Sequence, residues 1–393
     1  MSTSRQVGAV VGMSLQSLPQ RWGSSSVIVI GMAGVVGVLL GLLAMVTGFE
    51  KTLGATGRED RAIVLRGGSD SELASSISRE NALTILDAAG VKRNAEGKAI
   101  GSADVVVIVD LPKKSNDSGA NVTIRGVGPQ GLAVRPEIRI VEGRMFKPGL
   151  REIIVGKGAQ HQFKGLGLGE KIGLRASDWT IVGTFESGGD SHESELIADA
   201  ETVLSAYGRN LYQSVFAQLD SAAAFDVFKK ALTSNPTLSV DVKRERDYYA
   251  EQAKNLSWLR IVANVVGTIM AVGALFGALN TMYSAVSTRS REIATLRAIG
   301  FGGLPVVLSV MLEALLLSII GGAIGAGLAW LFFNGNAVST LGGNFTQVVF
   351  KLTVTPQLIT LGIIWACVIG VIGGLFPAIR AARLPVATAL RAS

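Results

Sequence analysis

Four long apolar runs divide the chain, one near its start and three in its last third. They cover residues 27–46, 261–282, 304–333 and 357–375, and the first run holds no charged side chain. A helix needs about 20 apolar residues to cross a bilayer, and each run is near or above that length. The last run follows Pro356 and ends before Pro377. The pattern therefore predicts four transmembrane helices.

The segment before the first run is amphipathic. Apolar residues recur there at helical spacing, followed by Pro19, Arg21 and Trp22. This indicates a helix over residues 5–18 that lies at the cytoplasmic interface, with Trp22 at headgroup level. A cleaved signal peptide is the competing interpretation. The 26 residues before the first run, and the lack of a small-residue cleavage site before Phe49, favour a retained membrane helix.

Between the first and second runs, charged residues return and the apolar segments become short. Most of these segments are bounded by Gly, Pro, Asp or Asn, which is typical of strands. Strands are predicted at 62–65, 105–109, 122–124, 138–141, 153–155, 171–174 and 180–185, and helices at 79–89, 222–232 and 244–255. We predict an α+β domain of about 200 residues with two lobes, one of them a β-rich insert at about residues 137–205.

Basic residues in the short segments predict the orientation. Eight arginines lie in the first segment, the 287–303 connection and the tail, whereas the 334–355 connection carries only Lys351. Short cytoplasmic loops are enriched in Lys and Arg, so both termini and the 287–303 connection are predicted to be cytoplasmic. The large domain is then extracytoplasmic. The arginines are Arg5, Arg21, Arg289, Arg291, Arg297, Arg380, Arg383 and Arg391.

The predicted fold is an α-helical membrane protein with four transmembrane helices and a large extracytoplasmic α+β domain between helices 1 and 2. Its parts are a cytoplasmic segment (1–22), helix 1 (23–49), the extracytoplasmic domain (50–256), helix 2 (257–286), a cytoplasmic coupling segment (287–303), helix 3 (304–333), a polar external loop (334–355), helix 4 (356–377) and a cytoplasmic tail (378–393).

Composition supports this architecture. The 393 residues are 48% hydrophobic and 17% charged, against about 25% charged in average globular chains. The mean hydropathy is +0.41. The net charge of +7 is not gathered in one tail, so we expect no nucleic-acid partner. The single cysteine, Cys367, lies inside an apolar run and is interpreted as a small buried hydrophobe, which excludes an intrachain disulfide.

The charged segment 288–299 is the main candidate functional element. Its apolar residues Ile293, Leu296 and Ile299 recur at helical spacing. Such a helix can lie on lipid headgroups or dock on a soluble partner, and a basic loop that only sets topology is the third interpretation. Its charged residues are Arg289, Arg291, Glu292 and Arg297, and Glu292 lies within reach of Arg289 on a helix.

Glu313 lies about nine residues into its apolar run, where a carboxylate is costly and is usually paired or near water. We expect Arg297 or Arg380 to be its partner, with a carboxylate that reaches the membrane interface as the alternative. Small residues four positions apart let helix backbones approach closely, and they occur in all four runs. These pairs are Gly37 and Gly41, Gly273 and Gly277, Gly321 and Gly325, and Gly370 and Gly374.

No catalytic, cofactor or metal site is predicted. Gly97-Lys98 and Gly156-Lys157 are not followed by Ser or Thr, so the phosphate-binding loop is absent, and so is G-x-S-x-G. A membrane-anchored enzyme is kept as the alternative of a different class. The densest polar cluster has glycine-rich surroundings, which favour an exposed loop over a metal site completed by His161. Its members are Asp190, His192, Glu193 and Glu195.

Several motifs stand in a fixed order around the four runs. SREIATLRAIGF at 290–301 precedes LEALLLSIIGGAIGAGLA at 312–329, and the tail from Pro377 to Arg391 is a third motif. The external domain carries VEGRMF at 141–146, the segment 153–158, LGEKIGL at 168–174 and WTIVGTF at 179–185. Together they cover nearly the whole chain and resemble the MacB/FtsX-like family of ABC-transporter permeases, which includes the lipoprotein-releasing permeases.

The resemblance implies a mechanism. Permeases of this family work as dimers with an ATPase and transmit ATP-driven motion to the external domain instead of passing substrate through a pore. By this likeness residues 288–299 are the coupling helix that docks on the ATPase. We therefore expect a chain that is not an enzyme by itself and binds no cofactor, with ATP and Mg²⁺ held by a separate ATPase polypeptide.

The resemblance also implies partners and location. We expect a multi-pass protein of the cell (inner) membrane that pairs with a second permease copy, identical or related. A periplasmic adaptor and an outer-membrane channel are further candidate partners. Lipoproteins, amphipathic drugs, peptides and siderophores are the candidate cargoes. The alternative is an FtsX-like regulator that transports nothing and switches an extracellular hydrolase. An adaptor or a hydrolase that copurifies with the external domain would discriminate the two.

Overall fold

The computed structural model describes residues 12, 22–175, 177–254, 258–341, 347–383 and 385. It divides into two compact units. The helical unit comprises Met1–Thr47, Trp258–Asn336 and Leu352–Ser393, and the β-rich unit comprises Gly48–Ser257 and Ala337–Lys351. Apart from residue 12, the predicted amphipathic helix at 5–18 lies outside the described residues, and so does the tail motif beyond residue 385.

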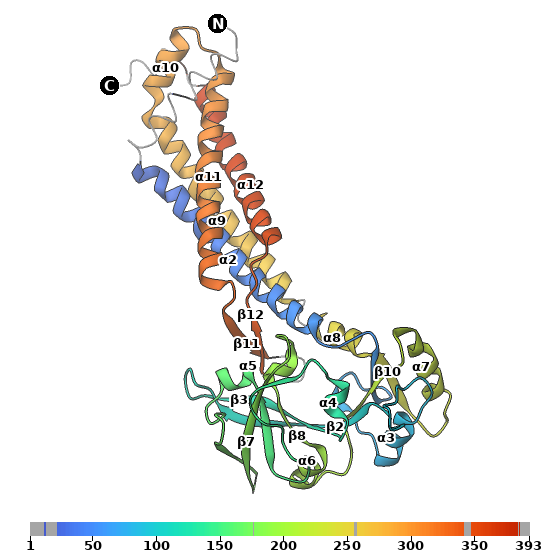
Figure 1. Ribbon diagram of the computed structural model, residues 1–393. Coiled ribbons are helices and arrows are strands. Elements are labelled where there is room, and N and C mark those ends of the chain that lie inside the picture. The colour runs from blue at the N-terminus through green and yellow to red at the C-terminus, as the bar shows by residue number, and fades with distance from the viewer. Residues whose placement is uncertain are drawn as a thin grey trace. The chain divides into compact units, whose positions relative to one another are not determined.

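Among the described residues, four helices are long and apolar enough to cross a membrane (Figure 1). Each contains one of the four predicted runs. At about 1.5 Å per residue, the 31 residues of α11 exceed a hydrocarbon core of about 30 Å. The four helices are α2 (Trp22–Ala55), which continues from the helical unit into the β-rich unit, α9 (Trp258–Thr288), α11 (Gly303–Phe333) and α12 (Pro356–Ala382).

The last helix extends five residues beyond its predicted end at residue 377. α12 begins at an N-cap, where the Thr355 side chain accepts a hydrogen bond from a backbone N–H, and it continues through Pro377 to Ala382. Proline removes one backbone donor and would break an isolated helix. Here Ala378 and Ala381 are buried in the hydrophobic core of the helical unit. Packing of the last turn therefore offsets the lost hydrogen bond, and residues 378–382 are helical.

Close helix packing accounts for most of the predicted glycine pairs. A Cβ at Gly321 would lie 2.6 Å from the carbonyl oxygen of Val29 in α2, and one at Gly325 would lie 2.9 Å from the Cα of Ala33. Gly37, Gly41, Gly370 and Gly374 also face neighbouring helices of the same chain. Gly273 and Gly277 of α9 differ, because no atom of the described chain lies within 4 Å of a Cβ at either position.

This difference predicts opposite responses to alanine. Gly321→Ala should lower the free energy of unfolding by about 1–3 kcal/mol, because its methyl group would press on the α2 backbone. Gly273→Ala is the matched control and should be neutral or slightly stabilising, since alanine favours helix more than glycine does. Thermal unfolding in detergent micelles measures both variants. Equal melting temperatures would contradict the close α2–α11 contact.

The β-rich unit is built on a ten-stranded sheet in the order β10-β1-β9-β2-β3-β8-β5-β7-β4, with β6 paired to β7. All seven predicted strands overlap observed ones, and β6 has the predicted bounds. β8, β9 and β10 were not predicted. The strands are β1 (Arg61–Arg66), β2 (Gly101–Pro112), β3 (Gly119–Val127), β4 (Arg139–Gly143), β5 (Glu152–Gly156), β6 (Lys171–Leu174), β7 (Ser177–Glu186), β8 (Leu196–Asp199), β9 (Ser214–Gln218) and β10 (Val240–Arg244).

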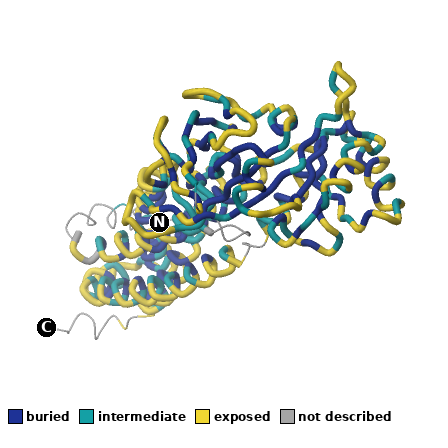
Figure 2. The backbone as a smooth tube through the Cα atoms, turned by 90° about the horizontal axis from the view of Figure 1, so that it is seen from below, coloured by how far each residue is buried: buried dark blue, intermediate teal, exposed yellow. Residues whose placement is uncertain are grey.

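Short helices flank this sheet, and those at 79–89, 222–232 and 244–255 correspond to α3, to η4 with α7, and to α8. Strands β1, β5 and β8 are almost entirely buried, whereas β4 is mostly exposed, and Figure 2 colours the backbone by this burial. The helices are η2 (Glu72–Ala74), α3 (Arg79–Leu86), α4 (Gly131–Val134), α5 (Lys157–Gln162), η3 (Ser191–Ser194), α6 (Ala200–Tyr207), η4 (Ala222–Ala224), α7 (Phe225–Thr233) and α8 (Glu245–Lys254).

Strands of the predicted insert at 137–205 adjoin one another in the sheet. They are β4 to β8, whereas β10, β1 and β9 lie at the other end. The β2–β3 hairpin joins the two ends, pairing with β9 on one side and with β8 on the other. One hydrophobic core cluster contains residues from both ends, among them Ala62 and Trp179. The sheet and this core are therefore continuous across the two predicted lobes.

The connection between α11 and α12 is not only the polar loop predicted at 334–355. It forms an antiparallel hairpin of β11 (Ala337–Leu341) and β12 (Gln347–Lys351), and this hairpin belongs to the β-rich unit. Phe350 is buried and meets the ring of Phe49 edge-on, with the centroids 5.5 Å apart. The apolar stretch of β12 is too short to be told from a loop by periodicity.

Candidate coupling site

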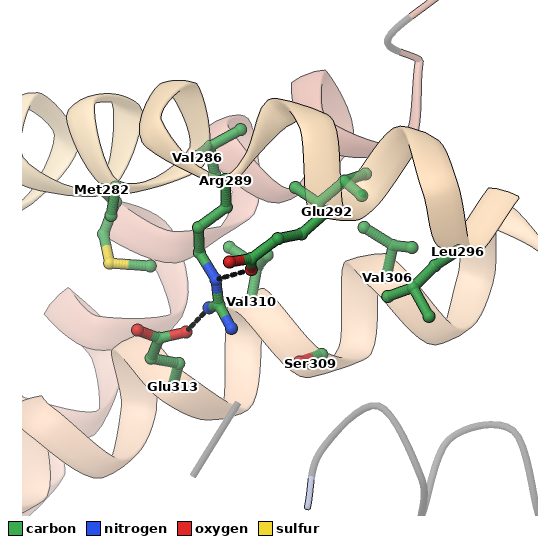
Figure 3. Close-up of a pocket in the computed structure, with 11 residues that line it drawn as sticks. Met282, Val286, Arg289, Glu292, Leu296, Val306, Ser309, Val310 and Glu313 are labelled. Atoms are coloured by element: carbon green, nitrogen blue, oxygen red, sulfur yellow. Dashed lines mark hydrogen bonds and ion pairs between the residues drawn. The ribbon is translucent and has the colours of Figure 1, made fainter. Parts of the chain in front are cut away.

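A small pocket in the helical unit lies where α9 ends, α10 (Ser290–Ala298) follows and α11 begins (Figure 3). α10 fills most of the predicted segment 288–299. Its lining combines apolar and charged side chains. The apolar side chains include Met282, Val286, Ile293, Leu296, Val306 and Val310, and the polar ones are Arg289, Glu292, Ser309 and Glu313.

Arg289 lies between two carboxylates at this pocket (Figure 3). Its Nη1 donates to Glu313 Oε2 over 2.8 Å, and its Nε donates to Glu292 Oε2 over 3.4 Å. The side chains of Arg289 and Glu313 are 12% and 7% exposed, whereas that of Glu292 is 64% exposed. Removing one partner of an ion pair that is shielded from water costs several kcal/mol of stability, whereas an exposed ion pair contributes little to stability. The Arg289–Glu313 pair therefore ties the start of α10 to α11.

The observed partner of Glu313 differs from the predicted ones. The sequence favoured Arg297 or Arg380, but the pair forms with Arg289. Arg380 instead places its guanidinium 5.4 Å from the centroid of the Tyr283 ring, and Arg297 is half-buried in the last turn of α10. The choice depends on how the chain turns between α9 and α11, which residue spacing alone does not give.

α10 has an inner and an outer face. Ile293 and Ala294 are buried, and Ile293 belongs to the hydrophobic core of the helical unit together with Val286 and Val306. Leu296 is half-buried at the pocket. The predicted apolar residues therefore do not share one face. Ile293 packs on its own chain, whereas Ile299 is 69% exposed. The exposed residues are Arg291, Glu292, Thr295, Ala298 and Ile299.

In the β-rich unit, the polar cluster near residue 190 is not the exposed loop that we predicted. Asp190 and His192 are buried, and residues 191–194 form η3. Asp190 caps η3 by accepting from the His192 N–H, and its Oδ2 lies 3.0 Å from His192 Nδ1. Burial alone would lower the pKa of His192, but the Asp190 carboxylate outweighs burial and raises it. No metal-holding group of three or more His, Cys, Asp or Glu side chains occurs among the residues described.

Three segments that connect the β-rich unit to the long helices contact η3. Thr56, just after α2, hydrogen-bonds Ser191 through its hydroxyl, which donates to Ser191 Oγ over 3.1 Å and accepts from the Ser191 N–H over 3.0 Å. Val349 of β12 donates its N–H to Ser194 Oγ over 2.8 Å. The Tyr249 ring of α8 meets the His192 ring edge-on at 5.9 Å. η3 is therefore the common contact of α8, the β11–β12 hairpin and Thr56, the residue that follows α2.

A buried ionic network begins one residue after η3. Arg125 of β3 donates to both carboxylate oxygens of Glu72 over 2.7 and 2.9 Å, and to both of Glu195 over 2.7 and 2.9 Å. Burial alone would raise the pKa of Glu72, but the Arg125 guanidinium outweighs burial and lowers it. A second buried pair joins Arg61 of β1 to Glu245 at the start of α8. These pairs fix η3 and α8 to the strands of the sheet.

The contacts at α10 join helices to one another, and those around η3 join helices to strands. Residues 288–299 are a candidate site in the sequence, whereas the network around η3 was not predicted. A signal for it was available, because Arg125 is the one charged residue in the strand sequence NVTIRGV, and a buried arginine requires acidic partners.

Comparison with known proteins agrees with this arrangement. The FtsX-like permease C-terminal family model matches residues 264–386, and the MacB-like periplasmic core domain model matches residues 25–235. The uncharacterized ABC transporter permease YknZ of Bacillus subtilis (strain 168) is 26% identical, over 97% of this chain and 98% of that protein. The macrolide export ATP-binding/permease protein MacB of Hahella chejuensis is 24% identical, over 78% of this chain and 48% of that protein.

The chain thus spans about half the length of that MacB relative. Among solved structures, the extracellular domain of a noncanonic ABC-type transporter YknZ from Gram-positive bacteria is 19% identical with a TM-score of 0.36, covering 47% of this chain and 99% of that one. The periplasmic core domain model alone covers more than half of this chain, and the permease model covers α9 to α12. The chain therefore belongs to the MacB/FtsX-like family of ABC-transporter permeases, as a membrane protein whose β-rich unit is the family's periplasmic core domain.

Proposed function

We propose that the chain is the membrane subunit of a dimeric ABC transporter that carries motion from a separate ATPase to its β-rich unit. The observation that carries this proposal is the convergence of α2, α8 and the β11–β12 hairpin on η3. All three segments lead directly into long helices, so a shift of those helices is delivered to one point of the sheet. Family membership supplies the ATPase as the source of the motion.

The other end of the proposed path is α10. Its outer face, with Arg291 and Ile299, docks on the ATPase, while Ile293 and the Arg289–Glu313 pair pass the displacement to α11. In this arrangement α10 and both termini are cytoplasmic and the β-rich unit is outside the membrane, as the distribution of arginines predicts. ATP and Mg²⁺ are bound by the ATPase.

A second permease copy is proposed to pack on α9. The exposed apolar residues of that helix include Ile261, Val265, Ile269, Val272 and Phe276, and Gly273 and Gly277 lie among them with free space around them. Small residues of this spacing permit close approach of helix backbones. The cargo is proposed to be an amphipathic drug, a peptide or a lipoprotein, handled with a periplasmic adaptor, since relatives carry the name of macrolide exporters.

Substitutions on the exposed face of α10 test whether the ATPase docks there. The double variant Arg291→Glu/Ile299→Asp should weaken association with the ATPase about 10- to 100-fold, because it reverses a rim charge and removes an apolar contact. Lys92→Glu, an equally exposed charge reversal in the β-rich unit, is the matched control and should bind as the wild type does. Binding is measured by titrating the ATPase onto the chain in nanodiscs. Unchanged affinity of the double variant would place the ATPase elsewhere.

Hydrogen exchange on the same assembly tests whether the motion reaches η3. This experiment needs no identified cargo. Trapping the ATPase with ATP and vanadate should change amide exchange at residues 187–195 and 347–351, where η3 and β12 meet. The amides of the central strands β5 and β8 serve as the internal reference and should not change. If exchange around η3 is the same with and without trapped nucleotide, the proposed path is wrong.

A further inference from the structure

The β-rich unit contains a strand edge that is open over only two residues and closed at both ends. β2 pairs with β9 as far as Asp104 and with β3 from Val105 onward. Beyond Asp104, the side of β2 that faced β9 has no neighbouring strand among the described residues. We propose that this edge is a docking site for a short, extended, acidic segment of another extracytoplasmic protein, which adds to β2 as a strand.

Hydrogen bonds of the neighbouring residues define the direction of this edge. The Val106 N–H donates to Gln213 Oε1 over 3.0 Å, and its carbonyl accepts from Arg209 Nη1 over 3.1 Å. At the other end, the Pro112 carbonyl accepts from the Lys164 N–H over 2.9 Å. Alternate residues of a strand direct their backbone groups to the same side. Ile108 and Asp110 therefore direct theirs to this edge as well.

The backbone groups of Ile108 and Asp110 have no hydrogen-bond partner within the described chain. These two residues are about 7 Å apart along the strand, so the opening accepts a segment of about three residues. An unpaired strand edge can hydrogen-bond to another extended backbone. The bonds that Val106 and Pro112 already make at the two ends of this edge limit how far such a partner can extend.

A second open edge faces the same space. In β7, the Thr180 N–H points away from β6 and donates to the Arg151 carbonyl, so residues 179 and 181 direct their backbone groups toward β6. Ile172 and Leu174 of β6 are therefore the residues that bond to β7. Gly173 therefore directs its backbone groups away from β7. The two edges line one groove of about 320 Å³ together with Tyr207, the last residue of α6, and Arg209. Its lining is Val107, Ile108, Val109, Asp110, Gly173, Leu174, Arg175, Tyr207 and Arg209.

Charge selects the kind of segment that fits. The groove has two arginines, Arg175 and Arg209, and one acid, Asp110. The Arg175 guanidinium lies 5.0 Å from the centroid of the Tyr207 ring, which holds it at the groove. Arg175 also has a left-handed backbone, with φ of 52°, in the turn between β6 and β7, where glycine is the usual residue. The two arginines outnumber the single acid of the groove, and this excess of positive charge favours a carboxylate on the docked segment.

The site is tested with the full chain in nanodiscs and labelled synthetic peptides, and this test does not depend on the ATPase. The probe is the blocked pentapeptide Thr-Val-Glu-Val-Thr, and binding is followed by fluorescence polarisation. N-methylation of alternate residues, which removes donors but keeps the side chains, should weaken binding at least tenfold. A peptide with lysine in place of glutamate should also bind at least tenfold more weakly.

A matched pair of variants separates the backbone edge from the side chain. Asp110→Pro removes the open N–H and should abolish binding, whereas Asp110→Ala keeps it and should bind the acidic peptide as well as or better than the wild type does. Proline costs no internal hydrogen bond here, because this N–H has no partner in the described chain. Equal binding by the two variants, equal binding of the N-methylated peptide, competition by free glutamate, or no binding at millimolar peptide would each overturn the proposal.

Discussion

Replacing Arg125 with methionine is expected to lower the free energy of unfolding of the β-rich unit by about 3–5 kcal/mol. Arg125 is buried, and its guanidinium holds the carboxylates of Glu72 and Glu195. Methionine fills part of the volume but leaves both acids without a counter-charge, which is the costly way to break a buried ion pair. Hydrogen exchange of the β3 and β8 amides, measured in the full chain in micelles, reports the loss.

The same variant should reverse the pH dependence of stability. In the wild type the pKa of Glu72 lies below its ordinary value of 4.5, so its contribution is present above about pH 4.5 and is lost as the pH falls through the folded pKa. Without Arg125, burial dominates and raises the pKa of Glu72, so folding takes up a proton. The variant should therefore gain stability as the pH falls from 7 toward 4.5.

The control for this prediction is Glu72→Gln/Arg125→Met. Removing the acid together with the base leaves less unpaired charge, so the double variant should recover part of the lost stability and show a flatter pH profile. A single variant Arg125→Met that loses stability on acidification, as the wild type does, would show that Glu72 is held by groups other than Arg125.

The second large effect is expected at α10. Glu313→Leu leaves the Arg289 guanidinium without its buried partner, so the free energy of opening α10 should fall by about 2–3 kcal/mol. This corresponds to amide exchange about 30- to 150-fold faster for residues 293–299. Under the proposed function, ATP hydrolysis should continue while the nucleotide-dependent change in exchange at η3 disappears.

Glu292→Gln is the matched control at the same arginine. Glu292 also contacts Arg289, but its side chain is largely exposed and the distance is 3.4 Å, so its loss should cost well under 1 kcal/mol. Arg289→Met/Glu313→Leu, which removes both charges, should restore slow exchange in α10. If Glu292→Gln and Glu313→Leu accelerate exchange equally, the buried pair is not what fastens α10 to α11.

Much of this architecture could be predicted from the sequence, because the membrane helices and most strands have a strong hydrophobic pattern. Residues 171–174 read as a strand because apolar and polar positions alternate there, and the structure has β6 over the same four residues. β8 has the sequence LIAD and follows a polar, glycine-rich stretch, so its four residues could not be separated from a loop. Its burial results from pairing with β3 and β5, which are distant in sequence.

The candidate sites could likewise be predicted only in part from the sequence. The α10 segment could be found because its charges interrupt two apolar runs. Which of its apolar residues face inward could not, because Ile293 and Ile299 have the same pattern and differ only in their neighbours. The polar stretch at Asp190 resembles an exposed loop in composition, and residues distant in sequence, among them Thr56, Tyr249 and Val349, contact it in the fold.

The hairpin between α11 and α12 also affects the order in which contacts can form during synthesis. The ribosome releases Ser194 long before Val349, which bonds to it from 155 positions later in the chain. This contact of η3 therefore forms only after the third long helix and the hairpin that follows it have been synthesised. The last contacts of the β-rich unit thus depend on synthesis of a membrane helix that lies much later in the chain.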